Sequence, residues 1–198
     1  MSRFAGIEIE PALLRGVKKR EPAATARLYD LLARPIHGLA TRILGDAEAA
    51  ADVTHDTFMT VVEKVGAVRS DAAFGGWVRQ IAVNECLARL RSPWHKRRVE
   101  GVETELSDGS LDAGRLNGWR DLEQALSALP ADTRFVVWMH EVEGYTHQEL
   151  ATLLDKSVSY SKSQLARGLD RLRGLVESGG VESGGVERGE VEKGEVHE

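Results

Sequence analysis

The chain has 198 residues, of which 42% are apolar and 29% charged, so it is long enough for one large or two small domains and apolar enough to build their cores. Its formal net charge is −5, and the segment 176–198, with seven acidic and two basic residues, accounts for it. The single cysteine, Cys86, excludes an internal disulfide and a multi-cysteine metal site, and no apolar run is long enough to cross a bilayer. We therefore expect a cytoplasmic protein with no membrane partner and no cofactor.

The first half of the chain has apolar residues at a period of about 3.6, which is typical of amphipathic helices. This pattern predicts four helices, over about residues 22–33, 35–44, 46–66 and 74–92. Pro35 suits the first turn of the second helix, and Asp46 can cap the third. Four such stripes can cover one another, so we expect one helical domain over residues 11–98.

Two segments of the chain look unsuited to a packed core. Residues 99–119 combine several carboxylates with glycines, which indicates a flexible acidic linker that holds the flanking domains apart. Residues 177–198 repeat a Val-Glu-containing pentad with glycine in every unit, which predicts a disordered acidic tail. Between them, residues 120–176 form the second expected domain.

The second domain contains the spacing of a helix-turn-helix motif. Thr146 and Glu149 fit a capping box, and a break over residues 155–157 separates that short helix from a longer one. In this motif the second helix lies in the major groove, so we expect DNA contacts from its outer face: Ser159, Tyr160, Lys162, Ser163, Gln164, Arg167 and Arg171. Gly168 costs that helix about 1 kcal/mol relative to alanine. Many helical hairpins have polar outer faces without binding DNA.

A second candidate nucleic-acid site lies between residues 74 and 98, where aromatic residues stand beside amides and basic residues. Such a mixture suits unpaired bases, which can stack on aromatic rings. The candidate contacts are Phe74, Trp77, Arg79, Gln80, Asn84 and Arg91. Trp77 fits a core position equally well, and basic residues at a helix end also complement the helix dipole.

Together the two sites resemble an extracytoplasmic-function (ECF) sigma factor of bacterial RNA polymerase. The first block, with ARLYDLLARPIHGLATRILGDAEAAADVTHDTF and FGGWVRQIAVNECLARLR, is similar to the family's promoter-melting domain. The second, with LSALPADTRFVVWMHEVEGYTHQELATLL and SVSYSKSQLARGLDRLR, is similar to its helix-turn-helix domain. The resemblance implies an all-α fold, in which a sigma-2-like helical bundle and a sigma-4-like domain are joined by the acidic linker.

The resemblance also implies a function without catalysis. The protein would bind the clamp coiled coil and the flap of core RNA polymerase and direct transcription initiation at promoter DNA that is partly single-stranded. The residues of the first block would contact the minus-ten element and those of the second the minus-thirty-five element. An anti-sigma factor would be the usual regulator.

The clamp-docking helix departs from the family. The family's pattern Asp-Ala-Glu-Asp aligns with Ala49-Ala50-Ala51-Asp52, so two of its three carboxylates are missing. The polymerase-binding residues that the resemblance leaves are Asp52, His55 and Asp56. Phosphorylation of Thr54 or Thr57 by a Ser/Thr kinase would add about −1.5 to −2 charge and replace the missing carboxylates. The other interpretation is that the alanines simply weaken polymerase binding.

Two other classes of protein compete with this interpretation. A helix-turn-helix regulator could act on duplex DNA without being a polymerase subunit, although that leaves the residues after Phe74 without a role. A helical enzyme could use one of the six histidines, His37, His55, His95, His140, His147 and His197. The sequence lacks the spacing of a helical zinc protease, a phosphate-binding glycine loop and a nucleophile elbow, so we do not expect an enzyme.

Overall fold

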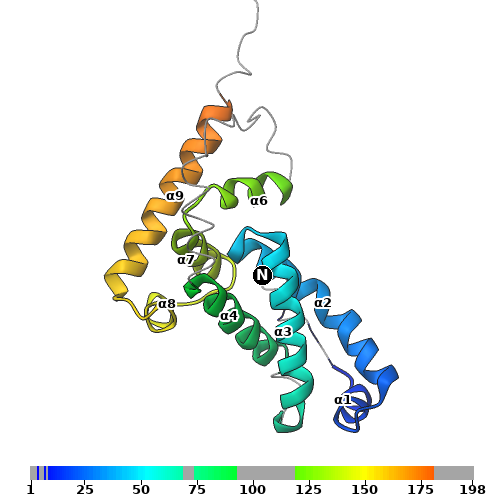
Figure 1. Cartoon of the computed structure of the whole chain (residues 1–198). Coiled ribbons are helices and arrows are strands. Elements are labelled where there is room, and N and C mark those ends of the chain that lie inside the picture. The colour runs from blue at the N-terminus through cyan, green and yellow to red at the C-terminus, as the bar shows by residue number, and fades with distance from the viewer. Residues whose placement is uncertain (1–3, 5–6, 8, 69–73, 93–118, 181–198) are drawn as a thin grey trace, which may run out of the picture.

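The computed structural model describes residues 4, 7, 9–68, 74–92 and 119–180. Within them every regular element is helical (Figure 1): α1 (Pro11–Lys18), α2 (Pro22–Leu44), α3 (Ala47–Lys64), the 3₁₀ turn η1 (Val65–Ala67), α4 (Phe74–Arg91), α6 (Trp119–Ser127), α7 (Ala131–Glu141), α8 (His147–Leu154) and α9 (Val158–Gly180). We call α1–α4 the N-terminal unit and α6–α9 the C-terminal unit. The expected all-α class is confirmed, whereas α1 is a helix that the apolar pattern did not predict.

The expected break at Pro35 is wrong, because α2 runs through this proline without interruption. A proline inside a helix removes a backbone hydrogen bond and crowds the preceding turn, at a cost of about 3 kcal/mol. Apolar side chains on both sides of it are buried in the same core: Leu28, Leu32, Ile36, Leu39 and Ile43. Burying one such side chain contributes about 1.5–3 kcal/mol, so the continuous apolar stripe outweighs the local defect.

The turn between α2 and α3 follows the sequence prediction. Gly45 ends α2 in the left-handed conformation, with φ +68°, and its N–H donates to the Thr41 carbonyl at 2.8 Å. Asp46 then caps α3, since its carboxylate accepts from the N–H groups of Glu48 at 2.9 Å and Ala49 at 3.2 Å. The two local caps set where α2 ends and α3 begins.

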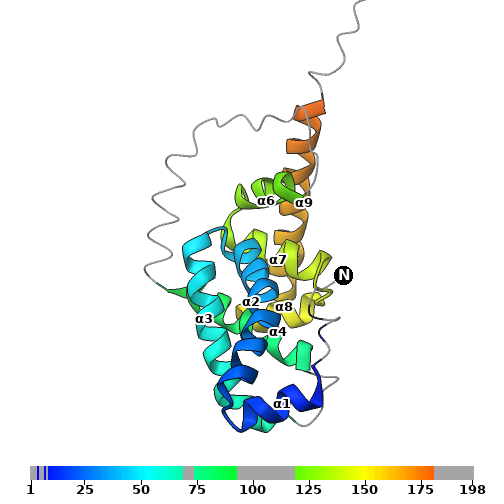
Figure 2. The same cartoon turned by 90° about the vertical axis from the view of Figure 1, so that its right-hand side faces the viewer.

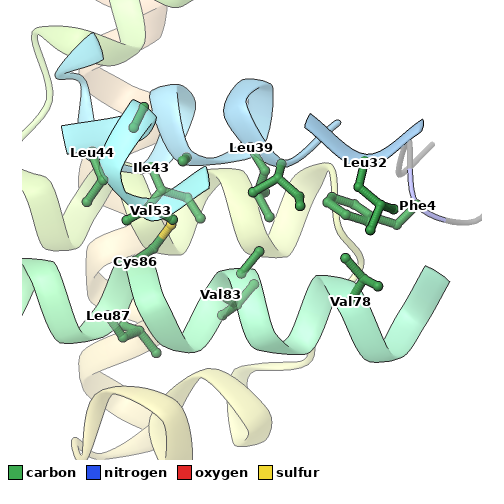
Figure 3. Packing of buried hydrophobic residues seen from close by; sticks show 14 of the residues in the cluster. Phe4, Leu32, Leu39, Ile43, Leu44, Val53, Val78, Val83, Cys86 and Leu87 are labelled. Carbon is green, nitrogen blue, oxygen red and sulfur yellow. The ribbon is translucent and has the colours of Figure 1, made fainter. Parts of the chain in front are cut away.

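Helix α4 closes the core of the N-terminal unit. Its buried side chains face those of α2 and α3, with Val83 and Cys86 pointing toward Leu39, Ile43 and Val53 (Figure 3). Cys86 is fully buried, and its burial raises the pKa of the thiol. This cysteine is therefore a packing residue in the centre of the bundle.

The C-terminal unit is organised by α7 and α9, which pack closely against each other. Gly168 permits this approach, because a Cβ atom at that position would lie 2.4 Å from Val137 Cγ2 and 2.9 Å from Thr133 Cγ2. The cost of a mid-helix glycine is thus offset by close packing. The predicted capping box at Thr146 and Glu149 is present, and Asp155, with φ +55°, makes the break before α9.

Two further features of the C-terminal unit concern the start of α7 and the end of α9. Asp132 lies inside the first turn of α7, whose N-cap is Pro130, and its carboxylate accepts a hydrogen bond from Tyr160 Oη at 2.7 Å. Helix α9 continues to Gly180, beyond the end expected at residue 176. The predicted linker, except for Trp119 in α6, and the tail from residue 181 lie outside the described residues, as do His95 and His197.

The expectation that the two units are held apart is wrong, because α7 packs against the C-terminal end of α2 and the buried core continues through both units (Figure 2). Arg134 of α7 is 5% exposed. It donates to the carbonyls of Ile43 at 2.9 Å, Leu44 at 2.5 Å and Ser127 at 3.2 Å. Its charge thereby meets the negative end of the α2 dipole, where the last carbonyls lack helical partners.

A second buried arginine strengthens the same contact. Arg42 of α2 donates to Glu123 of α6 at 2.8 Å, and its guanidinium lies 5.0 Å from the ring centroid of Trp138 in α7. The docked arrangement therefore has charge-assisted hydrogen bonds as well as apolar packing. None of the helices in the described part combines the length and hydropathy that a membrane-spanning helix needs.

Candidate nucleic-acid and polymerase interface

The outer face of α9 is open along most of the residues that the sequence predicts for it. These exposed polar and basic residues are Ser159, Lys162, Ser163, Arg167 and Arg171. The last two also line a hollow of about 480 Å³ between α9 and the start of α7. The carboxylate of Asp132 and the hydroxyl of Tyr160, which are hydrogen-bonded to each other, line the hollow as well, so the two arginines face a polar wall with one negative charge.

Two members of the predicted set are not on this open face. Gln164 is 9% exposed, and its Oε1 accepts from the buried Thr133 hydroxyl at 2.5 Å, so its expected place on the outer face is wrong. It lies one turn from Ser161 and Gly168, which pack inward. Tyr160 is half-buried; burial first, and then its hydrogen bond to Asp132, raises the pKa of its phenol to about 12.

Two histidines support the turn of the helix-turn-helix motif. The rings of His140 and His147 stack with centroids 4.5 Å apart, and His147 Nδ1 lies 3.0 Å from Ser161 Oγ in α9. Desolvation, followed by the nearby His140 and Lys162, lowers the pKa of His147. Across the described ranges no group of three or more His, Cys, Asp or Glu residues is placed to hold a metal ion.

The candidate minus-ten set on α4 divides into buried, exposed and covered residues. Phe74 is fully buried, so its expected contact with bases is wrong; its ring centroid lies 5.8 Å from that of the partly buried Trp77, with the two ring planes tilted by 46°. Gln80 and Asn84 are exposed, and Gln80 Nε2 donates to Asn84 Oδ1 at 3.2 Å. The α4 surface therefore offers amide groups to solvent one turn apart.

The C-terminal unit contacts three members of this set. Arg79 donates to the Glu143 carbonyl at 3.2 Å and to its carboxylate at 3.3 Å, and the guanidinium lies 5.1 Å from the Tyr145 ring centroid. Tyr145 Oη donates to Gln80 Oε1 at 3.4 Å. Arg91 donates to the Leu153 carbonyl of α8. In the docked arrangement these three side chains of α4 are bound by the helix-turn-helix unit.

The polymerase-docking candidates lie on α3, where Asp52 and His55 are exposed and Asp56 is partly exposed. Arg89 of α4 donates to Asp52 Oδ2 at 3.0 Å and to Asp56 Oδ2 at 3.0 Å. Arg89 was not expected at the polymerase-docking surface. The spacing of the two aspartates, four residues apart on one helix face, was the available signal that they share a cation.

The position of the alanines refines the comparison with the family's acidic pattern. Ala49 and Ala50 are buried at 4% and 0% exposure, whereas Ala51 and Asp52 are exposed. In this fold a carboxylate at position 51 would add charge to the surface, and one at position 49 would be buried. The outward-facing charge lost to the alanines is therefore one carboxylate, that of position 51.

The proposed phosphorylation sites are not on the surface. Thr54 is 5% exposed and donates to the Ala50 carbonyl at 2.7 Å, and Thr57 is 0% exposed. Both lie in the middle of α3, where a kinase cannot reach the hydroxyl and a doubly charged phosphate would have to be buried. The premise that these threonines lie on the docking surface is wrong, because the apolar period of α3 turns both toward the core.

Comparison with known protein families assigns both units. The model "Sigma-70 region 2" matches residues 28–96, and "Sigma-70, region 4" matches residues 119–172, so together they cover more than half of the chain. The first match lies in the N-terminal unit and the second in the C-terminal unit, which contains the helix-turn-helix. The fold and both surfaces thus define a sigma-70-type transcription factor.

Individual proteins with similar sequences indicate which group of sigma-70-type factors the chain resembles. The chain is 27% identical to the RNA polymerase sigma-H factor of Pseudomonas aeruginosa over 164 residues, covering 74% of this chain and 84% of that one. It is 28% identical to the ECF RNA polymerase sigma factor SigM of Mycobacterium tuberculosis over 143 residues, covering 72% of each. The chain belongs to the ECF sigma factors.

A solved structure supports the fold. The sigma factor RpoE, in complex with the anti-sigma factor NepR from Bartonella quintana, matches with a TM-score of 0.51 and 20% identity. The match covers 77% of this chain and 96% of that one.

Proposed function

We propose that this ECF sigma factor binds core RNA polymerase, recognises minus-ten and minus-thirty-five promoter elements and starts transcription without catalysing a reaction itself. The observation that carries the proposal is the open polar face of α9 in a helix-turn-helix, on the same chain as an amide-bearing α4. One surface suits duplex DNA and the other suits unpaired bases. Such a role belongs in the cytoplasm, where promoters are transcribed.

We assign the reading of the minus-thirty-five element to the exposed residues of α9. Ser159, Lys162 and Ser163 lie in the first turns of this helix, where a recognition helix reaches base edges. Arg167 and Arg171 lie further along, beside the start of α7, and suit the phosphates. The recognition part of the protein corresponds to residues 120–176.

We assign the opening of the minus-ten element to α4 within residues 11–98. Asn84 and Gln80 can hydrogen-bond the edge of an unpaired base, and Trp77, one turn before Gln80 on the same helix, is partly exposed. Arg79 can join them after the C-terminal unit has moved away, since it is part-buried against that unit here, whereas Arg91 is exposed and has one hydrogen bond to it. We infer that the docked arrangement is the polymerase-free form and that docking on polymerase separates the units through the 99–119 linker.

The docking surface for polymerase is the exposed part of α3, with Asp52, His55 and Asp56 toward the clamp coiled coil, and the C-terminal unit is the part that contacts the flap. Carboxylates on this helix suit a basic partner and steer its approach. The relative of known structure was solved with an anti-sigma factor, and we infer that a protein of that kind, holding the units together, controls this chain.

The test is reconstitution with bacterial core RNA polymerase on a library of genomic promoter fragments, followed by sequencing of the transcript 5′ ends. The expected result is a set of starts that share two spaced elements and depend on the added chain. Arg167→Ala should weaken binding to all of them and lower the salt slope by about one. Asn84→Ala should slow strand opening while leaving duplex binding unchanged.

A matched control for Arg167→Ala is Arg173→Ala, on the same helix, where Arg173 is exposed and pairs with Asp170 at 3.1 Å. This variant removes an equal charge outside the proposed DNA face and should transcribe as the unchanged protein does. Sequence-specific binding to duplex DNA by the chain alone, with no transcript in the presence of polymerase, would instead identify a helix-turn-helix regulator.

A further inference from the structure

The two carboxylates of the docking surface already have a partner within the chain. A single guanidinium, that of Arg89, donates one hydrogen bond to each of Asp52 and Asp56, both at 3.0 Å. The fork of an arginine suits two acceptors spaced in this way. Arg89 comes from α4, so the contact joins two helices that are close in space and more than thirty residues apart in sequence.

The electrostatic consequence is a docking surface with half of its formal charge cancelled. Two carboxylates contribute −2, and the guanidinium between them returns the local sum to −1. The hydrogen bond that Arg89 donates to Asp56, followed by the charges of both aspartates, raises the pKa of Arg89, so this group is charged wherever the aspartates are. A basic partner therefore approaches a weaker field than the two aspartates alone would make.

The same pairs are easy to exchange because all three side chains are in contact with water. Asp52 and Asp56 are 55% and 45% exposed, and Arg89 is 35% exposed. Ion pairs of this kind contribute little to folding because water solvates each partner after separation. Arg134 differs, because it is bound to buried carbonyls that water does not reach.

We infer that Arg89 is an intramolecular competitor for the polymerase-docking carboxylates, and that docking proceeds by exchange, in which basic side chains of the clamp replace the Arg89 guanidinium on Asp52 and Asp56. Arg89 thereby sets the affinity of this sigma factor for core polymerase, keeping it low in a chain whose position 51 is alanine. The inference rests on the proposed function, since it concerns the same docking surface.

The test compares the binding of purified core RNA polymerase to the full chain and to its variants, by titration over a range of salt concentrations. Arg89→Gln should bind roughly 2- to 10-fold more tightly, since it frees two exposed carboxylates. Its binding should also fall more steeply with salt than that of the unchanged chain. Arg89→Lys keeps the charge but can serve one carboxylate at a time, so its affinity should lie between the two.

A control separates the effect of Arg89 from that of net charge. Arg27→Gln removes one positive charge and an exposed pair, that between Arg27 of α2 and Glu10 at the start of α1 at 3.3 Å, and leaves the docking surface intact. It should bind polymerase as the unchanged chain does. Thermal unfolding of each variant checks that the fold is intact, and a mere structural role for Arg89 would show as unchanged or weaker polymerase binding.

A double variant distinguishes the two proposals. Asp52→Asn with Asp56→Asn should weaken polymerase binding, and adding Arg89→Gln to it should then have no further effect. If the double variant weakens binding but Arg89→Gln on its own does not tighten it, Arg89 is not a competitor for the two aspartates, and the docking assignment on α3 is retained. If the aspartate changes leave polymerase binding unaltered, the docking assignment on α3 fails and the competitor fails with it.

Discussion

The two surfaces that we propose for nucleic acid differ in their contacts within the chain. On α9 the basic and hydroxyl residues Lys162, Ser163 and Arg167 are open to solvent, whereas on α4 Arg79 and Arg91 are bound by the C-terminal unit. The α9 surface is the one that suits duplex DNA, and the α4 surface would hold unpaired bases, which exist only after polymerase has begun to melt a promoter. The difference teaches that the docked fold occupies Arg79 and Arg91 of the proposed strand-opening surface with contacts to the C-terminal unit, while among the described residues it leaves the arginines of α9 free of such contacts between the units.

The largest effect on this difference is expected from removing Arg134, which caps the C-terminal end of α2 and holds the two units together. Arg134→Leu removes a buried cation from the carbonyls of Ile43 and Leu44 and leaves them without partners. We expect a loss of about 3 kcal/mol in the free energy of unfolding, measured by urea denaturation, together with an increase in the radius of gyration. Desolvation lowers the pKa of Arg134 only to about 10, so the side chain is still charged at neutral pH.

The control for this variant is Arg173→Leu, which removes an exposed arginine that pairs with Asp170. It should leave both the unfolding free energy and the radius of gyration close to those of the unchanged chain. An Arg134→Leu chain as compact and as stable as that control would show that apolar packing alone holds the units together.

A smaller effect is expected from the cover over Arg79. Glu143→Ala removes the carboxylate that Arg79 contacts at 3.3 Å, and the backbone carbonyl at 3.2 Å stays as its acceptor. The free energy of unfolding should fall by about 1 kcal/mol, because the variant lacks one charged hydrogen bond of a half-buried group. Modification of Arg79 by phenylglyoxal, followed by mass spectrometry, should become several-fold faster, while Arg167 on the open surface should react as before.

Glu141→Ala is the matched control for Glu143→Ala, since it also removes one carboxylate near the end of α7. Glu141 is exposed, and the ion pair that the described residues show for it is with its neighbour His140. It should leave the reactivity of Arg79 unchanged. Equal reactivity of Arg79 in both variants would mean that the C-terminal unit covers α4 by packing and not through this ion pair.

The smallest expected effect concerns the histidine pair at the base of the helix-turn-helix. The pKa of His147 is lowered in the folded state by desolvation, then by His140 and Lys162, so the unfolded chain binds more protons. Stability from this group is therefore present above about pH 6.5 and is lost as the pH falls through its folded pKa. The effect should be slight because the site is largely hydrated. We expect the melting temperature of the unchanged chain to fall slightly more between pH 8 and pH 5 than that of His147→Asn, which lacks the titrating group.

The sequence predicted best the features that close within a few residues. The Asp46 cap, the Thr146–Glu149 capping box and the break at Asp155 were all expected, because each depends on hydrogen bonds within one turn. The errors concern residues whose partners are distant. Phe74 and Gln164 looked available for DNA, and the structure buries both against other elements.

By itself the sequence determined the helical class, most helix boundaries and the membership of two sigma-factor regions, since periodicity, caps and motif residues are local properties of the chain. Only the tertiary structure decided that the units dock, that Arg89 occupies Asp52 and Asp56, and that Thr54 faces the core. The physical reason is that a long charged side chain can satisfy its hydrogen bonds with any acceptor that folding brings within reach. Which acceptor that is depends on how helices far apart in the sequence pack together.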